Sequence, residues 1–531
     1  MKQMPVIQRE YGAGANASTE RAAQVLGCQL SDQRLTECGQ PIGSVGRGMR
    51  MACKVLLFSL LVILPGCTVG PNYHAPAVAA PAQWSSPLVG GETSNSVAIA
   101  SWWKNFNDPE LNSLMARAVN SNLDLQLATA RVREARAQYG VTSAGLWPAI
   151  GSSASYERQR QSQNQPLLGT FPIPSGAFEN NVYQAGFDAA WEIDVFGGAR
   201  RATEASRAGV AAAEFGRRDT LVTLLGDVAR NYVEARGFQR QLMIARENIK
   251  AQEDVLAITQ DRFRHGLTSD LDVQQAATLL ATTRAGVPTL ESSLATSIHR
   301  LGVLLGQPPG ALLVELSNVT PVPGASPEVP VGLPSELLLR RPDVQQAERQ
   351  LAAATAQIGV AQADLFPKFS LTGAAGFQSV SASDWFAGAS RFWSFGPTVQ
   401  WNIFDAGRIR GIIKVQNARQ EQALVNYEKT MLAAFEDVEN ALVAYAKEQV
   451  RRRSLADAVS SSQESLHLAN QLYTNGLVNF IDVLDAERTL YQAQDQLVQS
   501  ERAVSVDLIS LYKALGGGWE TALPLANPLN H

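Results

Sequence analysis

The sequence predicts an internally duplicated α+β membrane protein, and three observations lead to this fold class. A motif around Gly266 recurs around Gly476, and two pairs of segments alternate apolar with polar residues at a period of two. Two further runs keep helical spacing without proline over about 67 residues each, far more than an ordinary helix. A repeated unit of this size indicates one duplicated body instead of several unrelated domains.

Landmarks in the two halves match at one constant offset. Residues 263–273 recur as residues 473–483, with Gly266 and Gly476 at the same place in the motif. The same offset relates Trp191 to Trp401, Asp227 to Asp437, and Gly306 to Gly516. We therefore expect the same order of strands and helices in both halves.

An apolar segment near the N-terminus ends at a cysteine. Residues 55–64 are apolar except for Ser59 and follow Lys54, and this run is too short to span a bilayer. A basic start, a short apolar core and small residues before a break are typical of a secretory signal peptide. With Gly66 before Cys67, the segment resembles a bacterial lipoprotein signal, so Cys67 is the expected site of lipid attachment.

The four cysteines all lie at or before Cys67. The mature chain is therefore expected to have no disulfide framework and no cysteine metal site. Residues 1–48 are polar and of mixed charge, and Met49 or Met51 is a better start for an export signal. We expect residues 1–66 to be a leader, with 1–48 an over-extended gene start.

Charge and motif content argue against several function classes. The formal net charge is −4, so no nucleic-acid partner is expected. The five histidines are scattered, and the sequence contains no Walker loop, nucleophile elbow or dinucleotide fingerprint in a suitable context. We expect the protein not to be an enzyme and to bind neither a metal nor a cofactor.

An extended tether and a first helix are predicted before the strands. Residues 68–97 are rich in proline, alanine and serine, which favours an extended linker. Asp108 then precedes a run with apolar residues at helical spacing. We expect one helix from this point to Leu146.

Two pairs of segments are predicted as β-strands. From Tyr183 to Val195, aromatic and apolar residues alternate with polar or small ones, and residues 395–403 repeat the pattern. Each of these strands has an earlier partner, near residues 149–156 or 369–377. An apolar, aromatic face at about ten residues per strand is typical of a membrane β-barrel, whereas a water-facing antiparallel sheet is the alternative.

The number of strands indicates that several copies share one barrel. One chain offers four strands, which cannot close a barrel, and lipid does not tolerate an open sheet edge. Two copies would provide eight strands and three copies would provide twelve. Membrane lipid would then surround the shared barrel.

Two long helical hairpins are expected beyond the strands. Residues 199–265 and 408–475 would form helices about 100 Å long at 1.5 Å per residue. Gly266 and Gly476 end these helices in tight turns that allow positive φ, and the chain returns in a second helix each time. Pro288 predicts a local kink in the first return helix.

Four motifs, in order along the chain, resemble one family. They are the segments from Cys67 to Tyr73, from Trp102 to Pro109, from Leu333 to Asp343 and from Leu511 to Trp519. Together they resemble the TolC-like outer-membrane efflux factors, in the lipoprotein branch that serves resistance-nodulation-division (RND) pumps. The resemblance covers nearly everything from Cys67 to Trp519.

This resemblance implies an assembly and a function. It implies a homotrimer with a twelve-stranded transmembrane β-barrel that continues as a long periplasmic α-helical barrel. Such a protein is a passive exit duct for drugs or other small toxic compounds, driven by an inner-membrane RND pump through a periplasmic membrane-fusion adaptor. The alternatives are the outer-membrane duct of a protein-secretion system and a non-transport coiled-coil structural lipoprotein.

The resemblance also implies roles for residues near the two turns. The adaptor would contact the tips, which comprise Gly266, Leu267, Thr268, Gly476, Leu477 and Val478. In the family a leucine and an aspartate one helical turn apart narrow the periplasmic opening, and the matching residues here are Leu466 and Asn470. Asn470 has no carboxylate, so the copies would not form the acidic ring that the family's aspartate provides. A ring of Leu466 side chains could still exclude water. Ordinary helix packing is the alternative role for both residues.

The expected domain organisation follows the repeat. It comprises a leader (1–66), a lipid-anchored tether with an equatorial segment (67–110), a first repeat with its tip at 266 (111–310), an equatorial linker (311–335), a second repeat with its tip at 476 (336–518) and a tail (519–531).

Overall fold

The computed structural model of the chain describes residues 68–76, 81–85, 92–93, 99–160, 179–324, 329–332 and 334–521. The chain separates into two units, Met1–Pro65 and Gly66–His531, and all described residues belong to the second. The expected leader, the lipid-attachment residue Cys67 and the tail residues 522–531 lie outside the described residues.

Both repeats contain the same elements in the same order. The first comprises α2 (Pro109–Ser121), α3 (Leu123–Ala144), β2 (Ala149–Arg160), β3 (Glu179–Ile193), α4 (Gly198–Arg264) and α5 (Asp270–Leu304). The second comprises α6 (Pro334–Arg340), α7 (Pro342–Ala363), β5 (Lys368–Ser379), β6 (Arg391–Gln400), α8 (Arg408–Thr474) and α9 (Phe480–Ala514). Helices α4 and α8 both have 67 residues, and α5 and α9 both have 35. The predicted duplication is confirmed.

The prediction of a single helix from Asp108 to Leu146 is wrong, because the helix is interrupted at Asn122. Asn122 has extended backbone angles (φ −62°, ψ 131°) and separates α2 from α3. Its side chain accepts a hydrogen bond from the Leu125 amide and donates one to the carbonyl of Leu304, both at 2.9 Å. Asparagine side chains compete in this way with helical backbone bonds, so one residue suffices for the break.

Strand boundaries also differ from those predicted. Strand β3 already begins at Glu179, and β6 ends at Gln400, before the Trp401 and Ile403 that were expected on its apolar face. Beyond β6, the Asp405 carboxylate accepts hydrogen bonds from the backbone of the coming α8, so the residues that follow Gln400 form the approach to the helix. Helix α5 continues through Pro288.

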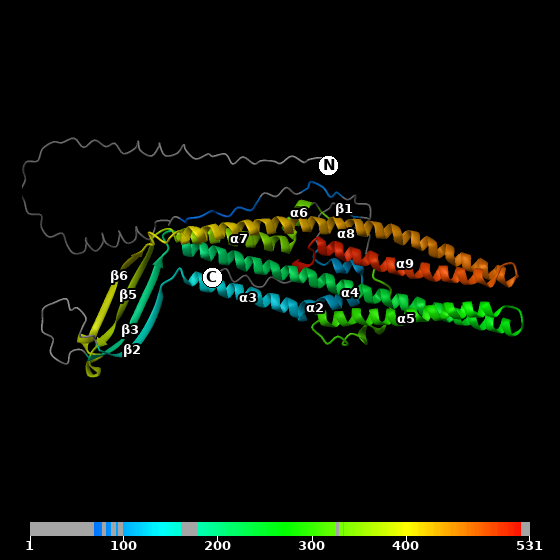
Figure 1. The fold of residues 1–531 in the computed structure, drawn as a ribbon, viewed down its shortest axis with the longest axis horizontal. Coiled ribbons are helices and arrows are strands. Elements are labelled where there is room, and N and C mark those ends of the chain that lie inside the picture. Colours follow the sequence, from blue (N-terminus) through cyan, green and yellow to red (C-terminus); the bar gives the residue numbers. More distant parts are fainter. Residues whose placement is uncertain are drawn as a thin grey trace, which may run out of the picture. The chain divides into compact units, whose positions relative to one another are not determined.

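The four long strands form one antiparallel sheet in the order β2-β3-β5-β6, so β3 and β5 join the two repeats. A separate short pair, β1 (Glu92–Thr93) and β4 (Val329–Pro330), is parallel and was not predicted. The strands lie at one end of the Gly66–His531 unit, and the α4–α5 and α8–α9 turns lie at the other (Figure 1). Among the described residues, no helix combines the length and apolar character that a membrane crossing requires.

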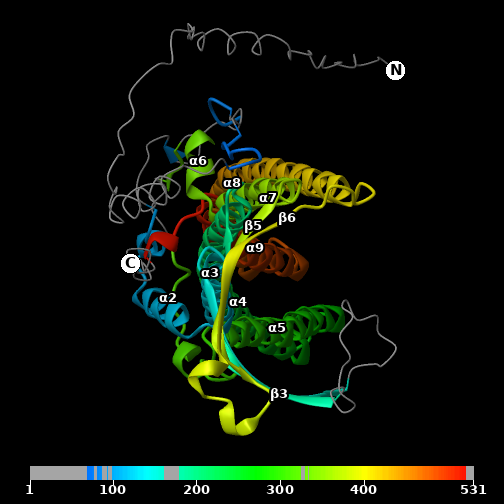
Figure 2. The ribbon, with the colours of Figure 1, turned by 90° about the vertical axis from the view of Figure 1, so that its left-hand side faces the viewer.

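Helix α4 is the centre of the helical layer. It packs against α3, α5, α7 and α9, and α7 packs in turn against α8, as the view from the strand end shows (Figure 2). The main core lies where these helices meet the 3-10 helix η1 (Trp102–Phe106), and there Trp102 stacks on Tyr512 with ring centres 5.2 Å apart. A second, smaller cluster near the turns contains Ala276, Phe480, Val483 and Leu484.

Candidate functional site

The strand register brings the predicted apolar residues onto one face of the sheet. Directly paired residues point to the same side, and two neighbouring rows on this face are Ser152-Phe187-Ala375-Trp393 and Ile150-Ala189-Gly373-Phe395. Rows on the other face are mostly polar or small, for example Gly151-Asp188-Ala374-Ser394, and Phe392 is the large apolar exception in the rows described. Large side chains of the first face, including Ile150, Phe187, Trp393 and Phe395, are exposed. An exposed aromatic face of this extent is suited to lipid contact.

Two equivalent indole contacts connect the strands to the short helices. The indole nitrogen of Trp191 donates to the carbonyl of Leu146 at 3.0 Å, and that of Trp401 donates to the carbonyl of Leu365 at 3.0 Å. Amphipathic indoles favour such a position between an apolar face and a polar end. The repeat therefore extends to individual side-chain contacts.

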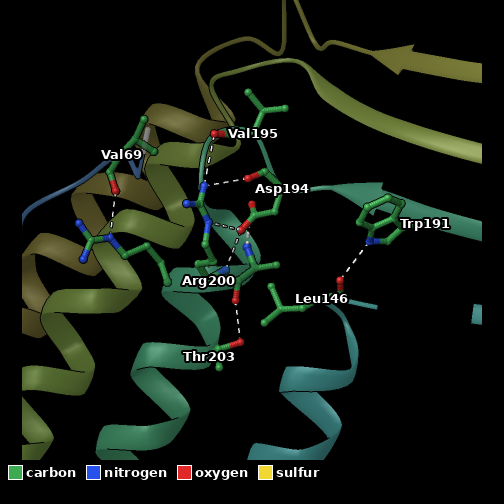
Figure 3. A network of polar contacts seen from close by, with 9 residues as sticks. Val69, Leu146, Trp191, Asp194, Val195, Arg200 and Thr203 are labelled. Carbon is green, nitrogen blue, oxygen red and sulfur yellow. Dashed lines mark hydrogen bonds and ion pairs between the residues drawn. The ribbon is translucent and has the colours of Figure 1, made fainter. Parts of the chain in front are cut away.

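The start of α4 is held by the carboxylate of Asp194. Its two oxygens accept the backbone N–H groups of Ala199 at 3.2 Å and of Arg200 at 2.8 Å, and the Arg200 side chain also bonds to it (Figure 3). A carboxylate satisfies the free amides of the first helical turn and interacts favourably with the helix dipole. The strand thus passes into the helix through a fixed corner.

Both predicted turns have the same backbone geometry. Gly266 and Gly476 have φ values of 70° and 72°. In the first turn, Leu267 donates to the carbonyl of Arg262 and Gly266 to that of Phe263, each at 2.9 Å. The second turn has the equivalent bonds from Leu477 and Gly476, to Leu472 and Tyr473. Such bonds satisfy the free carbonyls of a helix end and require a residue that tolerates positive φ.

The helices that leave the turns begin with matching capping boxes. Ser269 with Asp272 starts α5, and Asn479 with Asp482 starts α9. Burial opposes ionisation of Asp272, but hydrogen bonds from Thr268 and Ser269 outweigh it and lower the pKa of this carboxyl. Both turns are thus rigid, and they present exposed leucines, Leu267 and Leu477.

The structure places the two expected constriction residues in different environments. Leu466 and Asn470 lie one turn apart near the end of α8. Leu466 is half-buried and packs against the cluster of Ala276, Phe480, Val483 and Leu484, whereas Asn470 is exposed.

The motif from Leu333 to Asp343 connects three helices through Arg341. Its guanidinium forms two bonds with Asp343, at 3.0 and 2.7 Å, and reaches Asp437 of α8 at 3.0 Å. It also donates to the carbonyl of Ala514 at the end of α9, at 3.1 Å. Several donors in a fixed plane explain why arginine is suited to this position.

Two residues with unusual surroundings were not singled out by sequence reasoning. Glu487 on α9 has a carboxylate oxygen that is buried without a hydrogen-bond partner among the described residues. Its equivalent in the first repeat is Ala277. This difference between the two repeats is the signal by which the sequence could have identified Glu487. Arg201 is buried at the start of α4, and its equivalent is Gly411. Over the part of the chain that the structure describes, no group of His, Cys, Asp and Glu is placed to hold a metal ion.

Comparison with known families identifies the family to which both repeats are similar. A model of the outer membrane efflux protein family matches residues 114–307 and 333–517, which are the two repeats. Relatives include the probable outer membrane lipoprotein SilC of Salmonella typhimurium, 34% identical over 88% of this chain and 99% of that protein. Nodulation protein T of Rhizobium leguminosarum bv. trifolii is 33% identical over 87% of this chain and 96% of its own length.

Solved structures with the same fold include other outer-membrane channels. The channel OprN superposes with a TM-score of 0.80 at 36% identity, over 86% of this chain and all of that chain. CusC, whose structures concern conformational changes during folding and transmembrane channel formation, has a TM-score of 0.73 at 30% identity, over 85% and 100%.

Proposed function

Because the chain belongs to the outer membrane efflux protein family, we propose that three copies form one closed duct through the outer membrane. The chain is an outer-membrane efflux channel; the relative SilC is named as a probable outer membrane lipoprotein and OprN as an outer-membrane channel. The duct would consist of a twelve-stranded transmembrane barrel that continues as a periplasmic helical tunnel.

The observation that carries this proposal is an apolar stripe on α8 that one copy leaves uncovered. Leu432 and Val443 of α8 are 63% and 47% exposed, whereas their equivalents in α4, Val222 and Val233, are 5% and 0% exposed. Helix α4 is covered because α7 and α9 of the second repeat pack on it. By the same repeat geometry, α3 and α5 of a neighbouring copy would cover α8.

The sheet supports the same head-to-tail arrangement. The outer edges of β2 and β6 have no strand partner among the described residues, whereas β3 and β5 pair across the repeats. Pairing of β6 with β2 of the next copy would repeat the β3–β5 contact. Head-to-tail interfaces close into rings when the rotation per copy allows it, and closure removes both open edges.

The remaining site assignments are also proposals. The tip residues Gly266, Leu267, Thr268, Gly476, Leu477 and Val478 would contact the periplasmic membrane-fusion adaptor of an inner-membrane RND pump. Leu466 and Asn470 would line the narrow periplasmic end, and acylation of Cys67 would anchor the chain in the outer-membrane lipid. The domain boundaries expected from the sequence are proposed with them.

The names of the relatives do not agree on one cargo. Relatives of similar identity are named for different cargoes, such as a cation efflux protein of Escherichia coli and a pyoverdine export protein of Pseudomonas aeruginosa. A passive duct leaves the choice of cargo to the pump. The relatives' names are consistent with that division of labour.

The test is conductance across a planar bilayer, with the oligomeric mass measured in the same detergent. A trimer with small, flickering conductance is the expected result. A monomer or dimer without conductance would contradict the shared barrel.

A further inference from the structure

The first described residues of the chain are held by a buried arginine. Arg201, near the start of α4, is 4% exposed. Its Nε donates to the carbonyl of Val69 at 3.1 Å, and its Nη2 donates to the carbonyl of Gly70 at 3.2 Å and to Oδ1 of Asn72 at 2.7 Å. The amide of Val69 in turn donates to the carbonyl of Phe196 at 3.1 Å. Figure 3 shows the bond to Val69 beside the Asp194 corner.

Three glycines make room for this segment. Gly70 has φ +92°, and a Cβ on it would lie 2.4 Å from Cα of Gly359 in α7. A Cβ on Gly359 would lie 2.8 Å from Cγ of Arg201, and a Cβ on Gly197 would lie 2.8 Å from Cγ2 of Thr68. Approaches this close between backbones are possible only without side chains. The segment therefore packs closely against a set of residues that we call the seat, which comprises Phe196, Gly197, Arg201, Glu204 and Gly359.

The second repeat lacks an occupied equivalent of the seat. Its residue equivalent to Arg201 is Gly411, and around both Gly411 and the junction glycine Gly407 the space within 4 Å of an added Cβ is empty. The seat is consequently not a general feature of the strand-to-helix corner. It occurs at the corner where the N-terminal segment passes.

The polar groups indicate that the segment and the seat depend on each other. A buried guanidinium is costly unless its donors are satisfied. The seat itself provides one carboxylate, Glu204, at 2.8 Å from Nη1, and the other described bonds come from residues 69–72. Without the segment, the Nε and Nη2 donors would lose these partners.

We propose that the seat is a specific binding site for the extended peptide Thr68–Asn72, and that it fixes the acylated end of the chain at the corner between sheet and helices. This rests on the proposed acylation of Cys67, which directly precedes Thr68 in the sequence. The lipid anchor and the strands would then meet the membrane at one defined place. Arg201 is accordingly a positioning residue for the anchor.

The test compares variants that empty the seat with matched controls, all in the full-length protein. Gly70→Ala alters only the peptide, and Arg201→Ala removes its main partner. The controls are Gly209→Ala, on the same helix with open space around it, and Arg207→Ala, an exposed arginine of α4. The readout is the rate at which chymotrypsin cleaves after Tyr73 in detergent, measured by mass, beside the conductance of each sample.

Both seat variants should be cleaved at least about tenfold faster than the wild type, since several charge-assisted bonds are lost, whereas the controls should match the wild type. Cys67→Ser should stay protected, because the seat does not need the lipid. Seat variants that are acylated should also form less heat-resistant oligomer in the outer membrane. Equal cleavage of seat variants and wild type, or equal acceleration in the controls, would overturn the proposal. Absence of conductance in the wild type would contradict the duct and leave the cleavage comparison valid.

Discussion

Glu487 is a carboxylate in an apolar setting near the end of the hairpins. Val483 and Leu484, one turn earlier on α9, belong to the cluster that joins the four long helices near the turns. Burial raises the pKa of Glu487 from 4.5 to about 7. The folded state therefore binds this proton more tightly than the unfolded chain. Its contribution to stability is complete below about pH 4.5 and is lost as the pH rises through about 7.

The variant Glu487→Gln should remove this dependence, because glutamine keeps the shape and carries no charge. At pH 8 its melting temperature should exceed that of the wild type by about 2–4 °C, and at pH 4 the two should agree. Glu464→Gln, at an exposed position of α8, is the control and should change neither value. A constant difference at both pH values would mean that packing, not ionisation, separates the variants.

Leu466 allows the constriction to be separated from ordinary packing. If a ring of this leucine narrows the periplasmic opening, Leu466→Ser should raise single-channel conductance several-fold, because a hydroxyl admits water. Loss of its packing should also reduce the free energy of unfolding by about 2 kcal/mol. Leu468→Ser, at the exposed leucine two residues on, is the control. Reduced stability with unchanged conductance would assign Leu466 to packing alone.

At the scale of elements, the two hairpins are paired copies with rigid ends. Each turn combines a glycine at positive φ, a capping box and one exposed leucine, so its shape is set by the backbone. Rigid ends with exposed apolar side chains lose little entropy on binding a partner. This is the physical basis for placing adaptor contacts there.

The tips can be tested with Leu267→Glu combined with Leu477→Glu. Two charges at apolar contacts should weaken adaptor binding by about tenfold or more, and drug resistance conferred by the pump should fall. The amount of protein in the outer membrane should stay unchanged, because both side chains are exposed and outside the core. Val314→Glu, at another exposed apolar residue, is the control. A parallel fall in protein level would indicate a folding defect.

At the scale of the whole molecule, the repeat explains why one copy is incomplete. Contacts between the repeats cover α4 and pair β3 with β5, whereas α8, β2 and β6 lack the equivalent neighbours among the described residues. An apolar stripe exposed to water and two sheet edges exposed to lipid are unfavourable unless another chain covers them. The duplicated chain therefore has the geometry of one segment of a ring.

If neighbouring copies form a ring through the apolar stripe of α8, Leu432→Glu combined with Val443→Glu should prevent assembly. Two carboxylates buried between neighbouring copies would be desolvated without partners. This free-energy cost would exceed the favourable free energy of packing between the helices. The mass in detergent should fall from that of a trimer to that of a monomer. Val314→Glu should leave the trimer intact, and a trimer in the double variant would place the interface on another face.

Agreement between sequence and structure follows the range of the interactions involved. The long helices were expected at 199–265 and 408–475 and lie at Gly198–Arg264 and Arg408–Thr474, because periodicity and the terminal glycines are local signals. The break at Asn122 was missed, since a single asparagine hardly changes an apolar period and its partner, Leu304, is remote in sequence. The roles of Arg341 as a connection between three helices and of Arg201 in the seat were missed for the same reason.

The sequence by itself determined the duplication, the two strand pairs, the length of the two long helices α4 and α8, the turns at Gly266 and Gly476, and the family. These features depend on patterns within a few residues or on the match between the halves. Only the tertiary structure decided which faces are covered, that one carboxylate oxygen of Glu487 is buried and that Arg201 holds the N-terminal segment. Such facts depend on contacts between residues far apart in the chain. A helix of polar and small residues can pack against its neighbours with any of several faces, so its own sequence does not select one.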